Sequence, residues 1–167
     1  MKDVSFKQIN TTEMKKIASL AVLLFTVISA FSQALEYSEG YYYKNGMLYT
    51  GTFTESWPNK NVKVVQEIRN GLEDGKTEIY FENGKIQEMR SYLEGQKHGI
   101  WFTYDDKGLK LSEAYYRHNK KDGIWRVWDE NGKLRYEMYY SNGEKTGLWR
   151  IWDETGKLTS ERNYSSN

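Results

Sequence analysis

The chain has 167 residues, enough for one domain of ordinary size. Its 24 Lys and Arg residues nearly balance its 23 Asp and Glu residues, and beyond residue 32 the balance is 20 basic against 21 acidic. This argues against a nucleic-acid-binding protein, which usually carries a concentrated basic face. The absence of Cys excludes disulfides, thiolate metal sites, cysteine nucleophiles and lipid anchors on cysteine.

Residues 1–32 are expected to form an N-terminal extension and a hydrophobic signal helix. Two lysines precede an apolar run over residues 17–28, and small residues follow it up to Ser32. This order is typical of a secretory signal peptide. The alternative is an uncleaved membrane anchor, but the run is short for a span, which needs about 20 apolar residues. We therefore expect cleavage between Ser32 and Gln33, and a secreted or periplasmic mature chain.

After a lead-in over residues 33–39, the region 40–164 repeats with a period of 24 residues, and residues 165–167 form a tail. Several series of residues hold this spacing in one register. They are the opening glycines Gly51, Gly75, Gly99, Gly123 and Gly147, the turn glycines Gly84, Gly108, Gly132 and Gly156, the strand aromatics Trp101, Trp125 and Trp149 together with Tyr80, Tyr104, Trp128 and Trp152, and the closing tyrosines Tyr92, Tyr116, Tyr140 and Tyr164. A fixed period of this size indicates a repeat architecture.

Each copy predicts one β-hairpin and a link to the next. Runs that can lie extended are closed by Asn-Gly or a near equivalent, which is typical of β-hairpins. The full copies are 71–92, 95–116, 119–140 and 143–164. A degenerate first copy occupies 40–68.

The first copy differs from the others in its turn. Lys60 stands where the other copies have a turn glycine, and Trp57-Pro58 interrupts the run. We expect residues 41–53 to form a first hairpin and residues 62–68 to form the return strand. Terminal repeats are often atypical because they cap the stack.

Alternation along the strands predicts aromatic residues on both faces. Trp125 and Val127 share one side, and Arg126 and Trp128 share the other. In the return strand of that copy, Leu134, Tyr136, Met138 and Tyr140 are expected to face one way. Since no helix is expected to cover either side, the predicted fold is all-β: an elongated single-layer antiparallel meander of stacked β-hairpins.

The repeated pattern NGKxxGxWxxYDExGKLxxExxY resembles the MORN-repeat variant of bacterial proteins, often catalogued as YwqK-like toxin–antitoxin antitoxin components. The match includes Asn142 to Trp149 and Asp153 to Leu158, and it extends over about Gly40–Tyr164. Thr77 departs from it, because the other copies have Trp there. The resemblance implies no catalytic residues. It implies a scaffold that contacts other proteins or lipid surfaces.

Acidic residues recur before each turn glycine, as in Asp105-Asp106, Asp129-Glu130 and Asp153-Glu154. They could hold a cation such as calcium, but each loop offers too few carboxylates for a closed site. The preferred interpretation is that Asp starts the turn by accepting hydrogen bonds from its own backbone. No cofactor or metal is expected.

Glu113, Glu137 and Glu161 also recur, once per hairpin. Paired carboxylates can hydrolyse glycosides, but identical repeated residues do not supply the two different environments that acid and base need. Cross-strand pairing with Lys or Arg is the preferred role. His98 and His118 do not share the repeat register, and both are expected in link turns rather than in a catalytic or metal site.

The aromatic rows are the candidate functional feature. Trp101, Trp125 and Trp149 could form a flat stacking platform, although packing of the row on itself is favoured because a repeat needs a buried stripe. The candidate binding surface is a second aromatic row, on the opposite side of the strands, which neighbouring arginines keep exposed to solvent. It consists of Tyr104, Arg126, Trp128, Arg150 and Trp152.

The sequence thus predicts a secreted, non-enzymatic repeat protein that presents an aromatic sheet surface to a macromolecular partner. The partner is expected to be a protein. One alternative is a cell-wall or glycan-binding module, because aromatic and glycine repeats are also found in such proteins. Another is a toxin-neutralising or immunity-type protein, which rests on the resemblance alone.

Overall fold

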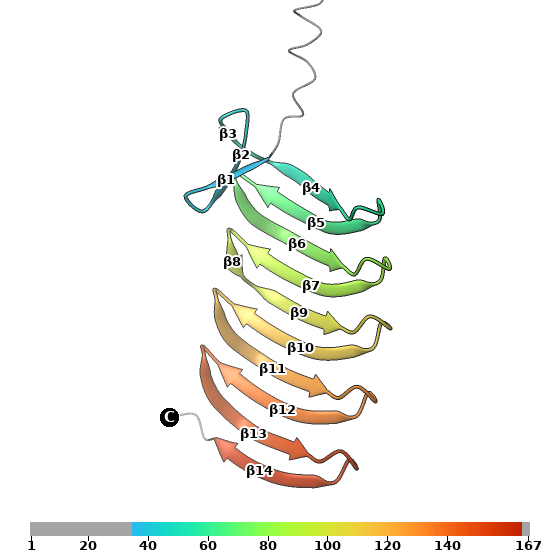
Figure 1. Cartoon of the computed structure of the whole chain (residues 1–167). Helices are drawn as coiled ribbons and strands as arrows, with labels where there is room; N and C mark the ends of the chain where they lie inside the picture. The colour runs from blue at the N-terminus through green and yellow to red at the C-terminus, as the bar shows by residue number, and fades with distance from the viewer. Residues whose placement is uncertain (1–34, 165–167) are drawn as a thin grey trace, which may run out of the picture. The chain divides into compact units, whose positions relative to one another are not determined.

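The computed structural model describes residues 35–164, and these are all-β (Figure 1). The strands are β1 (Glu36–Ser38), β2 (Tyr41–Lys44), β3 (Met47–Leu48), β4 (Gly51–Ser56), β5 (Val62–Arg69), β6 (Leu72–Tyr80), β7 (Ile86–Leu93), β8 (Gln96–Lys97), β9 (Gly99–Tyr104), β10 (Lys110–Arg117), β11 (Lys120–Trp128), β12 (Leu134–Ser141), β13 (Glu144–Trp152) and β14 (Leu158–Tyr164). None of the described residues forms a helix long and apolar enough to cross a membrane. The expected signal helix, its cleavage site and the 165–167 tail lie outside the described residues.

Strands β4 to β14 form one antiparallel sheet in which spatial order follows chain order, except that the short strand β8 pairs only with β7. Each hairpin pairs with the next, so the sheet is a meander of successive hairpins (Figure 1). The predicted all-β antiparallel stack is therefore confirmed. The large sheet is one layer thick, and in the described chain only Ile68 and Ala114 are buried apolar residues.

The first copy differs from the expectation. Of residues 41–53, only 41–48 form the expected hairpin, made by β2 and β3, because the chain leaves β2 after Leu48. Strands β1, β2 and β3 form a separate three-stranded sheet, and β1 lies inside the expected lead-in. Strand β4 instead begins the large sheet by pairing with β5.

The small sheet is attached to the large one at the link turn after β5. The amide of Gly71 donates to the carbonyl of Tyr49, and the amide of Tyr42 donates to the carbonyl of Gly71. Leu48 packs so close that a Cβ at Gly71 would lie 2.7 Å from its Cδ2 atom. The atypical first copy is therefore a cap on the end of the stack, as terminal repeats often are.

The opening glycines occupy irregular positions in the sheet register. Between β10 and β11 the pairing shifts after Ala114, and Gly123 lies in the shifted segment with φ +105°. A Cβ at Gly123 would lie 3.1 Å from the Cβ of Tyr115. Positive φ and a close neighbour together explain why glycine opens each copy.

A second register shift corrects the predicted face of Leu134. Val127 pairs with Tyr136, but Trp128 pairs with Leu134, which leaves Arg135 as the extra residue of a β-bulge. Directly opposed side chains lie on the same side of a sheet, so Leu134 lies with Trp128 rather than with Tyr136. Simple alternation fails here because the bulge resets it.

The hairpin turns share one hydrogen-bond pattern. In the third full copy, the amide of Asp129 donates to the carbonyl of Lys133 and the amide of Gly132 donates to the carbonyl of Asp129. The first copy makes the same pair of bonds between Trp57, Lys60 and Asn61. Lys60 adopts φ +71° to do so. The degenerate turn therefore keeps its geometry without the glycine.

Candidate functional site

One face of the large sheet carries a continuous ladder of alternating tyrosine and tryptophan rings. Six successive ring pairs have centroids 5.0–5.5 Å apart and interplanar angles of 55–65°. The rings are those of Tyr92, Trp101, Tyr116, Trp125, Tyr140, Trp149 and Tyr164. Such tilted contacts are the favoured geometry for aromatic pairs. The row packs on itself, and the suggested flat platform is wrong because the rings are tilted against each other.

Three lysines, each at or near the end of a strand that follows a link turn, lie over this ladder. The Nζ atom of Lys121 is 4.0 Å from the ring centroid of Trp125 and 4.7 Å from that of Tyr140. The equivalent contacts of Lys97 and Lys145 are 4.5–5.3 Å. A cation over a ring face is attracted by the ring quadrupole. We call the seven ladder rings and these three lysines the aromatic–lysine face.

The ladder tryptophans also complete the backbone hydrogen bonding of the sheet. The indole nitrogen of Trp125 donates to the carbonyl of Tyr115, 3.2 Å away at the register shift. Trp101 and Trp149 make the same bond to Ser91 and Tyr139, at 3.0 and 2.9 Å. A bulge leaves backbone groups of the strand without a hydrogen-bond partner on the next strand, and the indole N–H supplies a donor for the carbonyl. The repeated Gly-x-Trp spacing carried this signal, which sequence reasoning missed.

The opposite face carries a row of alternating acidic and basic side chains. Glu113, Arg126, Glu137, Arg150 and Glu161 follow one another across the strands with N–O distances of 2.8–3.5 Å. We call these five residues the ion-pair row. The predicted pairing of the repeated glutamates with cross-strand basic residues is confirmed. Hydrogen bonding to Glu137 raises the pKa of Arg126, so this cation stays charged.

The five residues of the candidate binding surface all lie on the ion-pair side. Arg126 and Arg150 belong to the ion-pair row itself, while Tyr104, Trp128 and Trp152 lie nearer the hairpin turns and are half-buried. Lys110 connects the two groups, with its Nζ atom 4.8 Å from the Trp128 ring centroid and 3.1 Å from Glu113. The structure thus brings the predicted residues together on one face.

The repeated aspartates act within their turns. The Oδ1 atom of Asp129 accepts hydrogen bonds from the amides of Asn131 and Lys133, both at 3.0 Å. Asp105 and Asp153 repeat this arrangement. These backbone hydrogen bonds lower the pKa of Asp129. The turn interpretation is confirmed, and the described residues hold no group of three or more His, Cys, Asp or Glu placed to bind a metal ion.

The two histidines meet in space although their sequence spacing did not suggest it. His118 lies in a link turn, as expected, whereas His98 lies between β8 and β9, and their ring centroids are 5.0 Å apart. His118 Nδ1 lies 3.0 Å from Gln96 Oε1, whereas the buried Nδ1 of His98 has no hydrogen-bond partner among the described residues. They come together because neighbouring repeats lie side by side in the sheet.

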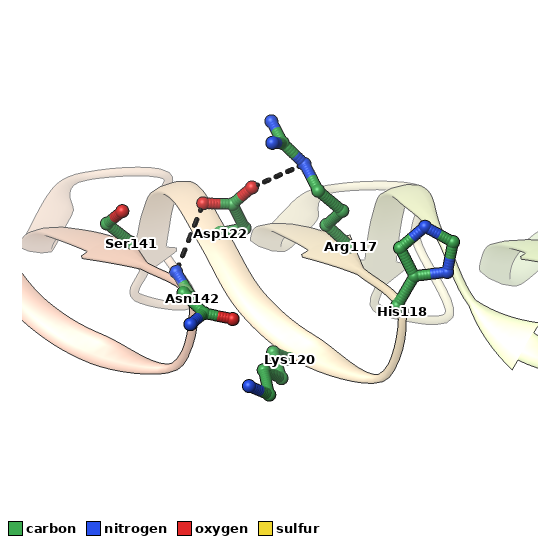
Figure 2. A pocket seen from close by; sticks show the side chains of 6 residues that line it. All are labelled: Arg117, His118, Lys120, Asp122, Ser141 and Asn142. Atoms are coloured by element: carbon green, nitrogen blue, oxygen red, sulfur yellow. Dashed lines mark hydrogen bonds and ion pairs between the residues drawn. The ribbon is translucent and has the colours of Figure 1, made fainter.

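A polar hollow of about 260 Å³ lies between two link turns (Figure 2). It is lined by Arg117, His118, Lys120, Asp122, Ser141 and Asn142. Within this lining, Asp122 pairs with Arg117 at 2.7 Å and accepts a hydrogen bond from the amide of Asn142 at 3.3 Å. These contacts tie one turn to the next and leave the acid and the arginine mutually neutralised.

A buried polar cluster fills the position where the second copy lacks tryptophan. Thr77 and Gln66 are 3% and 6% exposed, and the side chains of Gln66 and Thr77 both donate to Glu73 Oε1. Gln66 also bonds to the Tyr42 hydroxyl of the small sheet. Burial raises the pKa of Glu73. Thr77 therefore fits beneath the cap, where the small sheet replaces the aromatic ladder.

Three segments of this repeat region match a known family profile. The family profile described as MORN repeat variant matches residues 73–94, 121–142 and 145–166. The MORN repeat variant is found at three places in this chain. The matched segments begin at Glu73, Lys121 and Lys145, and each spans one hairpin and its closing tyrosine, so the MORN unit coincides with the structural repeat. No curated protein matches the chain. MORN repeats usually mediate binding or interaction.

Proposed function

We propose that this protein is a secreted, non-enzymatic scaffold that binds a macromolecular partner, most directly a protein, along its sheet. The observation that supports it is the single-layer sheet: in the described region both broad faces carry half-buried aromatic and charged side chains. Aromatic residues and arginine are the side chains enriched at protein interfaces. The repeated glutamates are engaged by arginines, which favours a structural role for them.

The test is recovery of one defined partner from an envelope extract by the immobilised protein. Trp128→Ala with Trp152→Ala alters the ion-pair side, and Trp101→Ala with Trp149→Ala alters the other side. The proposal expects one pair of substitutions to abolish recovery. Lys107→Gln with Lys157→Gln, at exposed hairpin turns, is the matched control that retains it. Recovery unaffected by either tryptophan pair would contradict the proposal.

The second candidate is a cell-wall or glycan-binding module. Trp128 and Trp152 favour it, because both rings are half-buried beside arginines on an open face. Binding to insoluble polysaccharide that is lost on Trp128→Ala and Trp152→Ala would select it over the protein partner. A YwqK-like antitoxin role is a third proposal, supported only by the sequence resemblance, and it predicts a toxic product encoded beside this gene.

A further inference from the structure

The charges of the aromatic–lysine face are of one sign over its C-terminal part. The residues that pair across strands β9 to β14 on this side are neutral apart from Arg162. Lys97, Lys121 and Lys145 add three ammonium groups. None of the ion pairs between described residues includes these four cations. The opposite side differs, because its arginines are matched by glutamates.

The three lysines are evenly spaced across the sheet. Lys121 and Lys145 are the second residues of β11 and β13, two strands apart, and Lys97 ends β8, just before β9. Neighbouring strands lie about 4.8 Å apart, so the ammonium groups repeat about every 9.6 Å. Each ammonium lies between a tryptophan and a tyrosine ring, which holds it at the sheet surface.

The spacing of the lysines is close to the length of two turns of an α-helix. Residues seven apart lie on the same side of a helix and about 10.5 Å apart. In an extended strand, residues three apart span a similar distance but point to opposite sides. The face is also wide enough: from Gly123 to Val127 a strand covers about 13 Å, against a helix diameter of about 10–12 Å.

Apolar side chains flank the lysine row on the same face. Val127, Tyr136 and Ile151 pair across consecutive strands, and Tyr136 and Ile151 are 40% and 38% exposed. A helix laid across the strands would place one row of its side chains over the lysines and the adjacent row over these apolar residues. Exposed apolar side chains in a row are typical of a protein-binding surface.

We propose that the aromatic–lysine face binds an acidic amphipathic helix of a partner protein, with a carboxylate at every seventh residue facing Lys97, Lys121 and Lys145. This deepens the proposed function, on which it rests. The helix runs across the strands, its acidic stripe over the lysines and its apolar stripe over Val127, Tyr136 and Ile151. Binding of such a helix depends on the even spacing of the lysines. Binding of a general anionic surface would depend only on their positive charge.

The test measures binding of labelled synthetic peptides to the full chain by fluorescence anisotropy at low salt. One helical peptide carries Glu at every seventh position beside an apolar stripe. A second has the same composition with the glutamates distributed around the helix. We expect the first peptide to bind at least about tenfold tighter, since exposed ion pairs contribute up to about 1 kcal/mol each. A polyproline peptide with Glu at every third residue has nearly the same spacing and serves as a shape control.

The substitutions Lys97→Gln, Lys121→Gln and Lys145→Gln together should remove that preference. Lys60→Gln, Lys107→Gln and Lys157→Gln remove the same charge from exposed hairpin turns and should leave it unchanged. Near-UV circular dichroism checks that both triple variants remain folded. The first triple variant should also lose most of the salt dependence of binding.

Three outcomes would overturn the proposal. The first is that the two helical peptides bind equally or not at all. The second is that the polyproline peptide binds more tightly than the helical ones. The third is that the peptides do not bind, while phosphatidylserine vesicles bind the wild type and fail to bind the variant with the three lysine substitutions. Partner recovery from the envelope extract is independent of these peptides. If recovery succeeds and the peptides fail, the acidic-helix proposal is wrong and the scaffold function stands.

Discussion

At the residue scale, a few side chains perform two tasks at once. Each ladder tryptophan packs between two tyrosines and donates a hydrogen bond to a carbonyl at the register shift. Each repeated aspartate closes its turn through amide hydrogen bonds. The sequence predicted the aspartates because Asx turns are local in the chain. It did not predict the indole bonds, because donor and carbonyl are ten residues apart and meet only after the strands pair.

Trp125→Phe should destabilise the protein through the lost hydrogen bond. Phenylalanine keeps an aromatic ring in the ladder but leaves the carbonyl of Tyr115 without its donor. An unsatisfied buried polar group costs about 1–3 kcal/mol of unfolding free energy, measured by urea denaturation. Trp128→Phe is the matched control, because that indole belongs to the other face. Equal destabilisation by both substitutions would argue against a role for the hydrogen bond.

Glu73→Gln should remove a pH dependence of stability. Burial raises the pKa of Glu73 in the folded protein, so its contribution favours folding at acidic pH and is lost as pH rises through that pKa. The amide oxygen of glutamine can still accept from Gln66 and Thr77. The melting temperature of the variant, relative to wild type, should therefore increase from pH 4 to pH 7. Glu73→Leu, which removes the acceptor that Gln66 and Thr77 share, should be less stable at either pH.

At the element scale, the repeat is a hairpin with two irregularities at fixed places. One lies at the opening glycine and the other beside the hairpin turn. The 24-residue period and the turn residues predicted the hairpins and their order. The bulges were not predicted, because a register shift depends on the partner strand, and this is why Leu134 was assigned to the wrong face. The separate sheet of β1 to β3 was missed because its strands are too short to show alternation.

Gly123→Ala should be more destabilising than Gly84→Ala. Both glycines have positive φ, at +105° and +83°, which costs an alanine about 1–2 kcal/mol. Only at Gly123 would the new Cβ meet a neighbour, the Cβ of Tyr115 at 3.1 Å, whereas nothing lies within 4 Å at Gly84. We expect an additional cost of about 1–3 kcal/mol at Gly123 in chemical denaturation. Indistinguishable values would show that the register shift adapts to the side chain.

At the scale of the whole molecule, the described repeats form one broad sheet. Most residues of the large sheet are half-buried, so its stability comes from contacts between neighbouring strands, as in other repeat proteins. Periodicity predicted this architecture and the two-sided aromatic pattern. It did not predict which face carries unmatched charge, because the pairing of arginine with glutamate depends on cross-strand register.

Mass spectrometry of the protein isolated from its own host should find a mature chain that begins at Gln33. The charged, apolar and small-residue order of residues 15–32 supports this cleavage. Substituting Ala30 and Ser32 with bulky residues should block processing and leave the longer chain in the membrane fraction. A mature chain that keeps residues 17–28 would show that this segment is an anchor.

The central claim is that both faces of the large sheet are open to a partner, and thiol accessibility tests it most directly. The chain has no Cys, so Tyr136→Cys and Arg150→Cys each give one thiol, on the aromatic–lysine side and the ion-pair side respectively. In the folded, isolated protein both thiols should react with a maleimide about as fast as after denaturation. If either thiol is strongly protected in the isolated protein, that face is covered within the molecule and the account is contradicted.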